Sequence, residues 1–249
     1  MPKFFVKNEQ IKENNITILG QDVNHIKNVL REKNGNEIVI CDFDEKIDYL
    51  CEILNINDTQ IDCKIIEKLE TNSESNIEVT IFQGLPKSDK MELVIQKSVE
   101  LGAFDITPIE MKRCIVKLND KEKNKKLQRW QKISEVAAKQ CGRNIIPKIN
   151  HIISLKNVVN TFKNYDKIIV AYEKENEKTL KEELIKLKKQ EKEKMKIGII
   201  IGPEGGIDEE EIKNLKENNV SIVTLGKRIL RTETVALNVL SVIMYELEN

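Results

Sequence analysis

Apolar and polar residues alternate in short runs over residues 1–70, a pattern typical of half-buried β-strands. Turn-forming pairs, such as Asn34-Gly35, separate the runs. The pattern predicts strands at residues 4–6, 16–19, 37–41, 49–54 and 61–66. Residues 22–31 place their apolar side chains on one face and predict a short helix. Many short strands with a single helix favour a small β-barrel.

The hydrophobic pattern changes after residue 76, where short apolar runs of strand length alternate with longer segments of helical period. Strands are predicted at residues 77–83, 106–111, 167–172, 196–201 and 221–225, and helices at residues 88–101, 125–140, 179–194, 208–218 and 232–248. The strands are apolar throughout, which indicates a mainly parallel sheet covered on both faces. Residues 71–76 are polar and predict a linker. We therefore expect a barrel domain at residues 1–72 and an α/β domain at residues 73–249.

Composition excludes some classes of protein and leaves others open. Apolar residues make up 40% of the chain and charged residues 33%, as in a folded globular protein. Lysine plus arginine and aspartate plus glutamate number 41 each, so a surface for RNA has to arise from local clustering of cations. No apolar run approaches the roughly 20 residues of a membrane span, and we expect a cytoplasmic protein.

The five cysteines and two histidines lack the spacing of a metal site. No Cys-x-x-Cys pair occurs, and the cysteines are far apart in the sequence. We expect no metal and no disulfide framework, but reduced and mostly buried thiols.

A glycine-rich turn, Gly202-Pro203-Glu204-Gly205-Gly206, follows the strand at residues 196–201 and leads into a helix. Ligands of open α/β sheets bind beyond the carboxyl ends of strands, and glycines let the backbone approach them. Glu204 and the carboxylates of residues 208–211 would repel a phosphate, which favours a neutral or cationic ligand. The sulfonium of S-adenosylmethionine satisfies this condition. A plain tight turn, with Asp208 and Glu211 as a capping box, explains the same residues equally well.

A second loop, residues 225–231, connects the last predicted strand to the last helix. Lys227, Arg228 and Arg231 stand just before the positive end of that helix, where they are unfavourable unless an anion joins them. Thr232 is the predicted N-cap. The final helix is apolar almost all round. It is either a subunit interface or the central helix of a monomer, and the sequence favours neither.

Further basic clusters stand at Lys90, at Lys112-Arg113 and around Lys139 to Arg143. Each one alone is most simply a solvated surface. Together they would form a surface that contacts RNA phosphates. Aromatic residues make up only 4% of the chain, so stacking of bases on several rings is not the expected mode.

These motifs together resemble the bacterial 16S ribosomal RNA uracil-N3 methyltransferases of the SPOUT superfamily, over nearly the whole chain. The glycine-rich turn and Leu225-Gly226-x-Arg228-Ile229-Leu230-Arg231-x-Glu233-Thr234 carry the most specific part of the resemblance. Three further segments match: His25-x-x-x-Val29-Leu30-Arg31, Gly84-Leu85-Pro86-Lys87 with Lys90, and Ala137-Ala138-Lys139-Gln140-Cys141-Gly142-Arg143.

The resemblance implies an N-terminal PUA-like β-barrel that binds RNA and a C-terminal SPOUT methyltransferase domain. It also implies a homodimer, a trefoil knot and a cofactor site in about residues 167–249, and the small ribosomal subunit as partner. S-adenosylmethionine would be held by residues of the two loops, namely Gly202, Glu204, Gly205, Leu225, Gly226, Ile229 and Leu230.

Methylation of uracil N3 requires loss of the N3 proton, for which Arg231 is the candidate charge stabiliser and Glu233 the weaker candidate base. A structural pair between Arg231 and Glu233 is the alternative. The candidate RNA contacts are Arg31, Lys90, Arg113, Gln140, Arg143 and Arg228. Two rival functions stay open, another SPOUT methylation of ribose or tRNA and a non-catalytic RNA-binding assembly factor.

Overall fold

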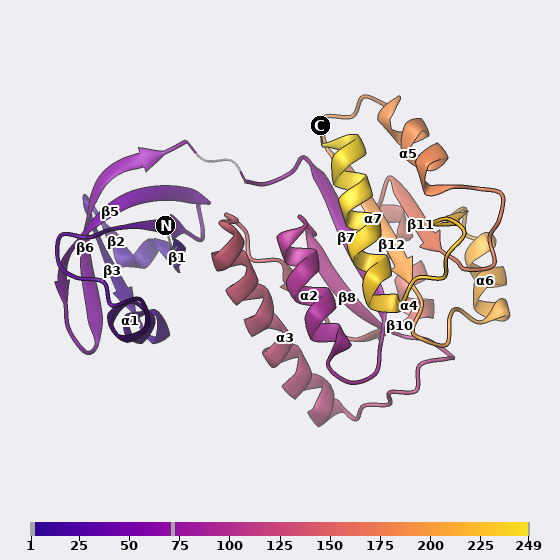
Figure 1. Cartoon of the computed structure of the whole chain (residues 1–249), viewed down its shortest axis with the longest axis horizontal. Helices are drawn as coiled ribbons and strands as arrows, with labels where there is room; N and C mark the ends of the chain where they lie inside the picture. Colours follow the sequence, from indigo (N-terminus) through magenta and orange to yellow (C-terminus); the bar gives the residue numbers. More distant parts are fainter. Residues whose placement is uncertain (1–2, 71–72, 249) are drawn as a thin grey trace. The chain divides into compact units, whose positions relative to one another are not determined.

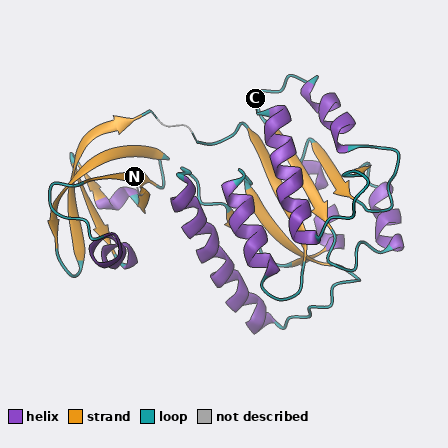
Figure 2. Cartoon of the chain, in the orientation of Figure 1, coloured by secondary structure: helices purple, strands orange, loops and turns teal. Residues whose placement is uncertain are grey.

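The computed structural model describes residues 3–70 and 73–248 (Figures 1 and 2). Its contacts divide the chain into two compact units, Met1–Glu74 with Ala138–Ile146, and Ser75–Ala137 with Pro147–Asn249. The sequence pattern did not show that residues 138–146 group with the first unit. The predicted boundary after residue 72 stays a prediction.

The first unit is a six-stranded curled sheet (Figure 1). Its strands are β1 (Lys3–Val6), β2 (Ile11–Lys12), β3 (Asn15–Leu19), β4 (Glu37–Asp42), β5 (Ile47–Ile56) and β6 (Gln60–Leu69). They follow the order β1-β4-β5-β6-β3-β2, antiparallel except for the pair β1–β4. The inward residues, including Phe4, Ile16, Ile38 and Ile61, form one core. Among the described residues, β1 and β2 are not paired, so the sheet curls without closing through these two strands.

The helix predicted at residues 22–31 is wrong in its details. One α-helical turn, α1 (Gln21–Asn24), continues as a π-helix, His25–Leu30, and Arg31 ends it with a φ of 58°. The π-helical hydrogen bonds add a residue to the turn and rotate the following side chains. Val23 and Ile26 are therefore buried, whereas Val29 lies 65% exposed.

The second unit is built on a seven-stranded sheet in which every pair is parallel. The order is β10-β8-β7-β12-β11-β13, and β9 also pairs with β8. The strands are β7 (Ile77–Gly84), β8 (Asp105–Glu110), β9 (Lys148–Ile149), β10 (Ile153–Ser154), β11 (Lys167–Ala171), β12 (Met195–Ile201) and β13 (Ser221–Val223). The predicted parallel sheet is confirmed, but the two-residue strands β9 and β10 were too short to show in the sequence pattern.

The helices of this part of the chain are α2 (Lys90–Glu100), α3 (Asp120–Cys141), α4 (Leu155–Val159), α5 (Leu180–Lys188), α6 (Glu209–Lys216) and α7 (Thr232–Leu247). Helix α7 packs against α2, α5 and the strands β7 and β12 (Figure 1). Helix α5 ends at Lys188, six residues before the predicted end, because residues 189–194 offer no apolar side chain to bury. The trefoil knot implied by the resemblance stays a prediction.

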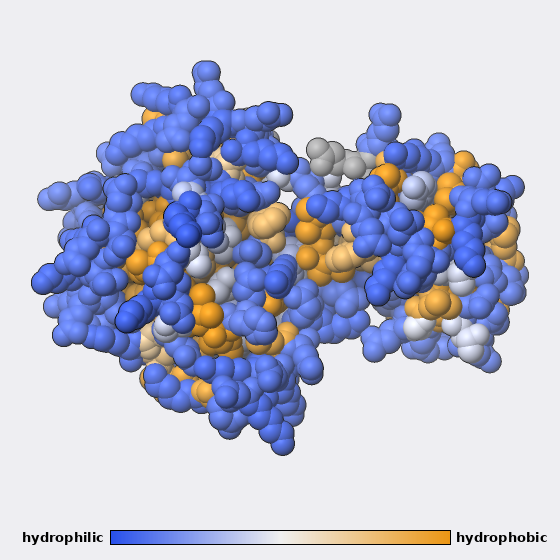
Figure 3. Space-filling model, turned by 180° about the vertical axis from the view of Figure 1, so that it is seen from behind, coloured by the Kyte–Doolittle hydropathy of each residue, from blue (hydrophilic) through white to orange (hydrophobic). Residues whose placement is uncertain are grey.

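Hydrophilic residues dominate the face of the molecule seen in Figure 3. Within residues 3–70 and 73–248, no helix combines the length and the apolar character that a membrane crossing requires.

Candidate functional site

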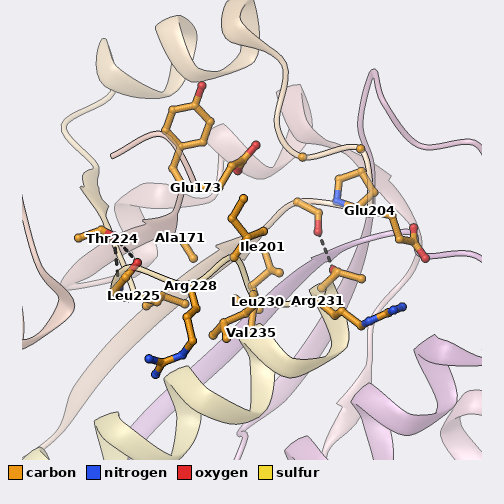
Figure 4. A pocket seen from close by; sticks show the side chains of 18 of the residues that line it. Ala171, Glu173, Ile201, Glu204, Thr224, Leu225, Arg228, Leu230, Arg231 and Val235 are labelled. Carbon is orange, nitrogen blue, oxygen red and sulfur yellow. Dashed lines mark hydrogen bonds between the residues drawn. The ribbon is translucent and has the colours of Figure 1, made fainter. Parts of the chain in front are cut away.

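The carboxyl ends of β11, β12 and β13 meet at one edge of the parallel sheet, and the segments that follow them enclose a pocket (Figure 4). Its volume is about 560 Å³, within the usual size of small-molecule sites. The start of α7 and Lys90 complete its wall. The lining consists of Lys90 and residues 171–173, 176, 201–206, 224–232 and 235. Both loops selected from the sequence thus line one pocket.

The glycine-rich turn lies close against its neighbours because three of its residues lack a side chain. A Cβ on Gly202 would stand 2.8 Å from Ile207 Cγ1. Gly206 has a φ of 70°, and its N–H donates to Pro203 O at 2.9 Å, which closes the turn. On the opposite side, a Cβ on Gly84 would stand 2.7 Å from Pro203 N. The turn therefore presents bare backbone to the pocket.

The acidic residues after the turn cap helix α6. Asp208 is the N-cap and accepts from Glu210 N at 3.2 Å, while Glu211 Oε2 accepts from Asp208 N at 3.2 Å. The predicted capping box is confirmed. The backbone N–H of Glu210, helped by nearby Lys112 and Arg113, holds the pKa of Asp208 below its ordinary value.

Ion pairs neutralise much of this acidic cluster, so the argument that it repels phosphate is weaker than the sequence indicates. Arg113 Nη2 lies 3.3 Å from Asp208 Oδ2, and Arg113 Nη1 donates to Gly205 O at 3.2 Å. Lys112 pairs with Glu210 and Lys174 with Glu209. Among the described residues, the carboxylates that line the pocket are those of Glu173 and Glu204.

Lys90 links the glycine-rich turn to the start of α7 through one carboxylate from each. Its Nζ lies 3.1 Å from Glu204 Oε1 and 3.2 Å from Glu233 Oε2. Glu204 Oε1 also accepts from the N–H of Lys87 at 3.0 Å. Burial favours a higher pKa for Glu204, but its backbone hydrogen bonds and Lys90 outweigh burial and lower that pKa. The hydrogen bond to Glu204 in turn raises the pKa of Lys90.

The alternative pair between Arg231 and Glu233 is not formed, because Glu233 contacts Lys90 instead. Glu233 Oε2 is buried and makes no hydrogen bond within the described part of the chain, although it lies in this ion pair. A buried carboxylate that faces Lys90 therefore stands at the start of α7.

The N-cap of α7 is Arg231, and the prediction of Thr232 is wrong. Thr232 lies in the first helical turn, where its Oγ1 donates to Gly202 O at 2.7 Å and accepts from Gln83 Nε2 at 2.8 Å. The helix predicted at residues 88–101 also starts later than expected, at Lys90. Ser88 has a φ of 54°, and Asp89 precedes the helix.

Three cations, Lys227, Arg228 and Arg231, are exposed at the pocket. Their side chains make no hydrogen bond or ion pair with any described residue. Figure 4 shows the guanidinium groups of Arg228 and Arg231 pointing in different directions. The backbone N–H groups of residues 227–230 likewise donate to no described residue. These groups are available to a ligand and to an anionic substrate.

The remaining residues predicted to contact RNA divide into two kinds. Arg31 and Gln140 are exposed. Arg143 is only 6% exposed and donates from Nη2 to Glu74 Oε2 at 2.6 Å, so it is a structural residue and not a surface contact. Glu74 lies in the predicted linker, of which residues 71–72 are outside the described residues. Residues 73–75 form neither helix nor strand, as expected of a linker, and the pair with Arg143 holds Glu74 in place.

The cysteines do not form a reactive site. Cys41, Cys51, Cys63 and Cys114 are buried, and burial raises the pKa of the first three to about 12. Cys141 is half-buried. Across the residues that the structure describes, no group of three or more His, Cys, Asp and Glu side chains is arranged to hold a metal ion.

The resemblance implies that the loop after Tyr172 also contacts the cofactor, and Glu173 of that loop lines the pocket. The sequence assigned no role to Gln83 or to the Thr232 hydroxyl. Glu173 follows β11 at the same sheet edge as the glycine turn follows β12, so the rule for parallel sheets was the available signal. No pattern in the sequence indicated the contact between Gln83 and Thr232.

The pocket fits S-adenosylmethionine in three respects. Apolar side chains, including Ile201, Leu225, Leu230 and Val235, offer a wall for a flat aromatic base. The carboxylate of Glu173 suits the positive charges of the sulfonium and ammonium groups, while that of Glu204 is shared with Lys90. The backbone N–H groups of residues 227–230 in the second loop donate to no described residue and are available to the ligand.

Comparison with known proteins agrees with this fit. Residues 73–244 match a family model described as RNA methyltransferase domain, and residues 18–66 match one described as RNA methyltransferase PUA domain. Ribosomal RNA small subunit methyltransferase E of Bacillus subtilis (strain 168) is 37% identical over 251 residues, which cover 100% of this chain and 98% of the relative.

Two solved structures with S-adenosylmethionine bound are also similar. One is a ribosomal RNA small subunit methyltransferase E from Neisseria gonorrhoeae, 29% identical, with a TM-score of 0.85 and coverage of 98% of this chain and 97% of that one. The other is a putative methyltransferase from Legionella pneumophila, 30% identical, with a TM-score of 0.85 and coverage of 98% and 96%. The predicted PUA-like and methyltransferase architecture is confirmed. The chain belongs to the family of RNA methyltransferases that includes the small-subunit ribosomal RNA methyltransferases E.

Proposed function

We propose that this chain transfers a methyl group from S-adenosylmethionine to N3 of a uridine in 16S ribosomal RNA of the small ribosomal subunit. The observation that carries the proposal is a glycine-lined pocket with unpaired cations around it, in a chain of this family. The names of the relatives support the small-subunit RNA as substrate, and the two similar structures support the cofactor. The choice of N3 rests on the sequence resemblance.

The cofactor would be held by the two loops that meet in the pocket. Bound there, it supplies an electrophilic methyl group on a sulfonium. The backbone of Gly202, Gly205 and Gly226 would contact it closely, and Glu204 would offset positive charge. Leu225, Ile229 and Leu230 would exclude water from the apolar part of the ligand.

Two residues at the start of α7 are suited to activate the uracil. Loss of the N3 proton leaves negative charge on the neighbouring carbonyl oxygens. Arg231 carries an exposed guanidinium without a partner among the described residues, which suits it to stabilise that charge. Glu233 is the weaker candidate for accepting the proton, because its buried Oε2 already lies 3.2 Å from Lys90 Nζ and its side chain does not line the pocket.

Contacts to RNA phosphates would come from exposed cations. Arg228 and Lys227 flank the pocket, and Arg113 is partly occupied by Asp208. Lys90 is already paired with two carboxylates, so it is better suited to hold the pocket wall together than to contact an RNA phosphate. Arg31 and Gln140 in the first unit remain candidates, and Arg143 does not.

We also infer a homodimer that uses α7 and acts in the cytoplasm, where bacterial ribosomes are. Tyr245 on this helix is 73% exposed, and Leu237, Val242 and Leu247 are only half-buried. An apolar helix left partly uncovered is typical of a subunit interface. Sedimentation of the protein and of Tyr245→Glu tests this inference, since the variant should be monomeric.

The test of function is a methyl-transfer assay with purified protein, labelled S-adenosylmethionine and small subunits that lack the modification, followed by mass spectrometry of the RNA. A methyl group on N3 of one uridine is the expected result. Methylation of a ribose, or of transfer RNA only, would show a different activity on this fold. Cofactor binding without transfer would indicate an assembly factor.

Single-turnover measurements then separate the roles of the arginines. Arg231→Ala should slow transfer by about 10²–10³-fold with little change in RNA affinity, because it removes charge stabilisation of the transition state. Arg228→Ala should weaken RNA binding and leave transfer from bound RNA unchanged. If Arg231→Ala transfers the methyl group at the wild-type rate but binds RNA weakly, Arg231 contributes to RNA binding and not to catalysis.

A further inference from the structure

A line of hydrogen bonds joins the centre of the sheet to the glycine-rich turn. Gln83, near the end of β7, is fully buried, and its Nε2 donates to Gly84 O at 3.0 Å and to Thr232 Oγ1 at 2.8 Å. Thr232 is 6% exposed, and its Oγ1 donates to Gly202 O at 2.7 Å, one of the dashed lines in Figure 4. Three segments far apart in the sequence thus meet through two side chains.

The direction of these bonds is determined by the groups present. A reversed carboxamide on Gln83 would bring its oxygen against Gly84 O, and two acceptors would face each other. Nε2 therefore points to Gly84 O, and its second hydrogen reaches Thr232 Oγ1. Because that oxygen already accepts one bond, its single proton is directed to Gly202 O.

The carboxamide keeps this orientation although its other end has no partner. Gln83 Oε1 is buried and accepts no hydrogen bond from any described residue. A buried acceptor without a partner is unfavourable, and such groups are rare in folded proteins. The orientation of Gln83 is therefore imposed by its two donor contacts.

Two contacts, one from β7 and one from α7, hold the same peptide of the glycine-rich turn. Gln83 is paired in register with Ile201, the last residue of β12, and Gly202 follows directly. Beside it, the missing side chain of Gly84 lets Pro203 approach. The Gly202–Pro203 peptide is thus held from β7 by packing and from α7 by the Thr232 hydroxyl.

We propose that Gln83 and Thr232 are positioning residues, which orient the Gly202 carbonyl and hold the glycine turn in its cofactor-binding shape before the ligand arrives. The turn would contact the cofactor mainly through its backbone, so the direction of its peptides determines affinity. The inference rests on the proposed function for the identity of the ligand. The orientation of the turn is testable without any ligand.

The hydrogen bonds that run from Gln83 through Thr232 to Gly202 form a relay. Thr232→Val tests this relay, because valine keeps the shape of threonine and lacks the hydroxyl. The dissociation constant for S-adenosylmethionine should rise about tenfold, as expected for one lost hydrogen bond to a buried group. Without cofactor, the Gly206 N–H, which closes the turn on Pro203 O, should exchange with solvent faster. Thr232→Ser keeps the hydroxyl and should restore both properties. RNA affinity should stay unchanged.

Thr107→Val is the matched control. Thr107 is also a buried threonine, and its Oγ1 accepts from Asn150 Nδ2 at 2.9 Å, but it does not line the pocket. This variant should lose stability and keep its cofactor affinity. Equal loss of affinity in both valine variants would overturn the proposal, since it would reflect general destabilisation.

Gln83→Leu provides an independent test. It should weaken cofactor binding in the same direction, and the double variant with Thr232→Val should bind no worse than Thr232→Val alone, because both changes break one relay. Additive losses would refute the relay. Wild-type protein that fails to bind S-adenosylmethionine would refute the proposed function, while unchanged exchange of the Gly206 N–H in Thr232→Val would refute this inference by itself.

Discussion

Substitution of Gly226 measures how strongly cofactor binding by the second loop depends on the backbone conformation of that loop. Its φ is 111°, a region that L-residues rarely adopt, and a Cβ built on it meets no atom within 4 Å. Gly226→Ala therefore adds no steric clash, and its whole effect is backbone strain of about 1–2 kcal/mol. The loop relieves that strain by leaving its native conformation.

The strain translates into a loss of cofactor affinity, because only the native loop conformation lines the pocket. A penalty of about 1–2 kcal/mol corresponds to a roughly 5–30-fold higher dissociation constant for S-adenosylmethionine. Isothermal titration with purified protein measures this constant directly. The free energy of unfolding should fall by no more than the strain itself.

Gly35→Ala is the matched control, since Gly35 has a φ of 88°, also meets no atom within 4 Å and lies in the first unit. It should lose similar stability and bind the cofactor like the wild type. If Gly226→Ala binds S-adenosylmethionine with wild-type affinity, the second loop does not hold the cofactor in the conformation described. The role assigned to Gly226 would then be wrong.

Three further predictions concern other parts of the chain. Glu74→Gln should lower the free energy of unfolding at pH 7 by about 3 kcal/mol, because the buried Arg143 loses its counter-charge. Burial favours a higher pKa for Glu74, but Arg143 and two backbone N–H groups outweigh burial and lower that pKa. The stabilisation is therefore complete above the unfolded-state pKa and is lost as the pH falls through the folded-state pKa, so urea titrations of wild type and variant should converge in acid. Arg228→Ala should make the plot of log RNA affinity against log salt concentration less steep by about 0.7–0.9, which is the contribution of one phosphate contact. An unchanged slope would show that Arg228 does not contact RNA. Gly84→Ala should lower the free energy of unfolding by about 1–3 kcal/mol, because the added Cβ would clash with Pro203 N. A variant as stable in urea as the wild type would contradict this close approach.

The sequence predicted those features whose cause is local. Apolar runs placed the long strands, and Asp208 capped α6 as expected. These features depend on a few neighbouring residues, so their pattern is readable along the chain. The two glycine-containing loops were recognisable for the same reason.

The features that the sequence did not show depend on contacts between distant segments. Thr232 has the residue type of an N-cap, but its hydroxyl bonds to Gly202, 30 residues away, and Arg231 takes the cap position without a side-chain bond. Arg143 looks like a surface cation, yet it pairs with Glu74, 69 residues earlier. Propensity and periodicity carry no information on such pairings, which appear only when the chain is folded.

The pocket is assembled from segments between Lys90 and Val235, most of which follow the carboxyl ends of β11, β12 and β13. No short stretch of the chain contains enough of it to hold a ligand, so affinity exists only in the native state of the whole second unit. Any molecule that occupies the pocket therefore opposes global unfolding, by about 2.7 kcal/mol at a hundred times its dissociation constant. Because β7 and β12 pair although they are distant in sequence, we expect this pairing to form slowly, so that a bound methyl donor would stabilise a state that the chain reaches late.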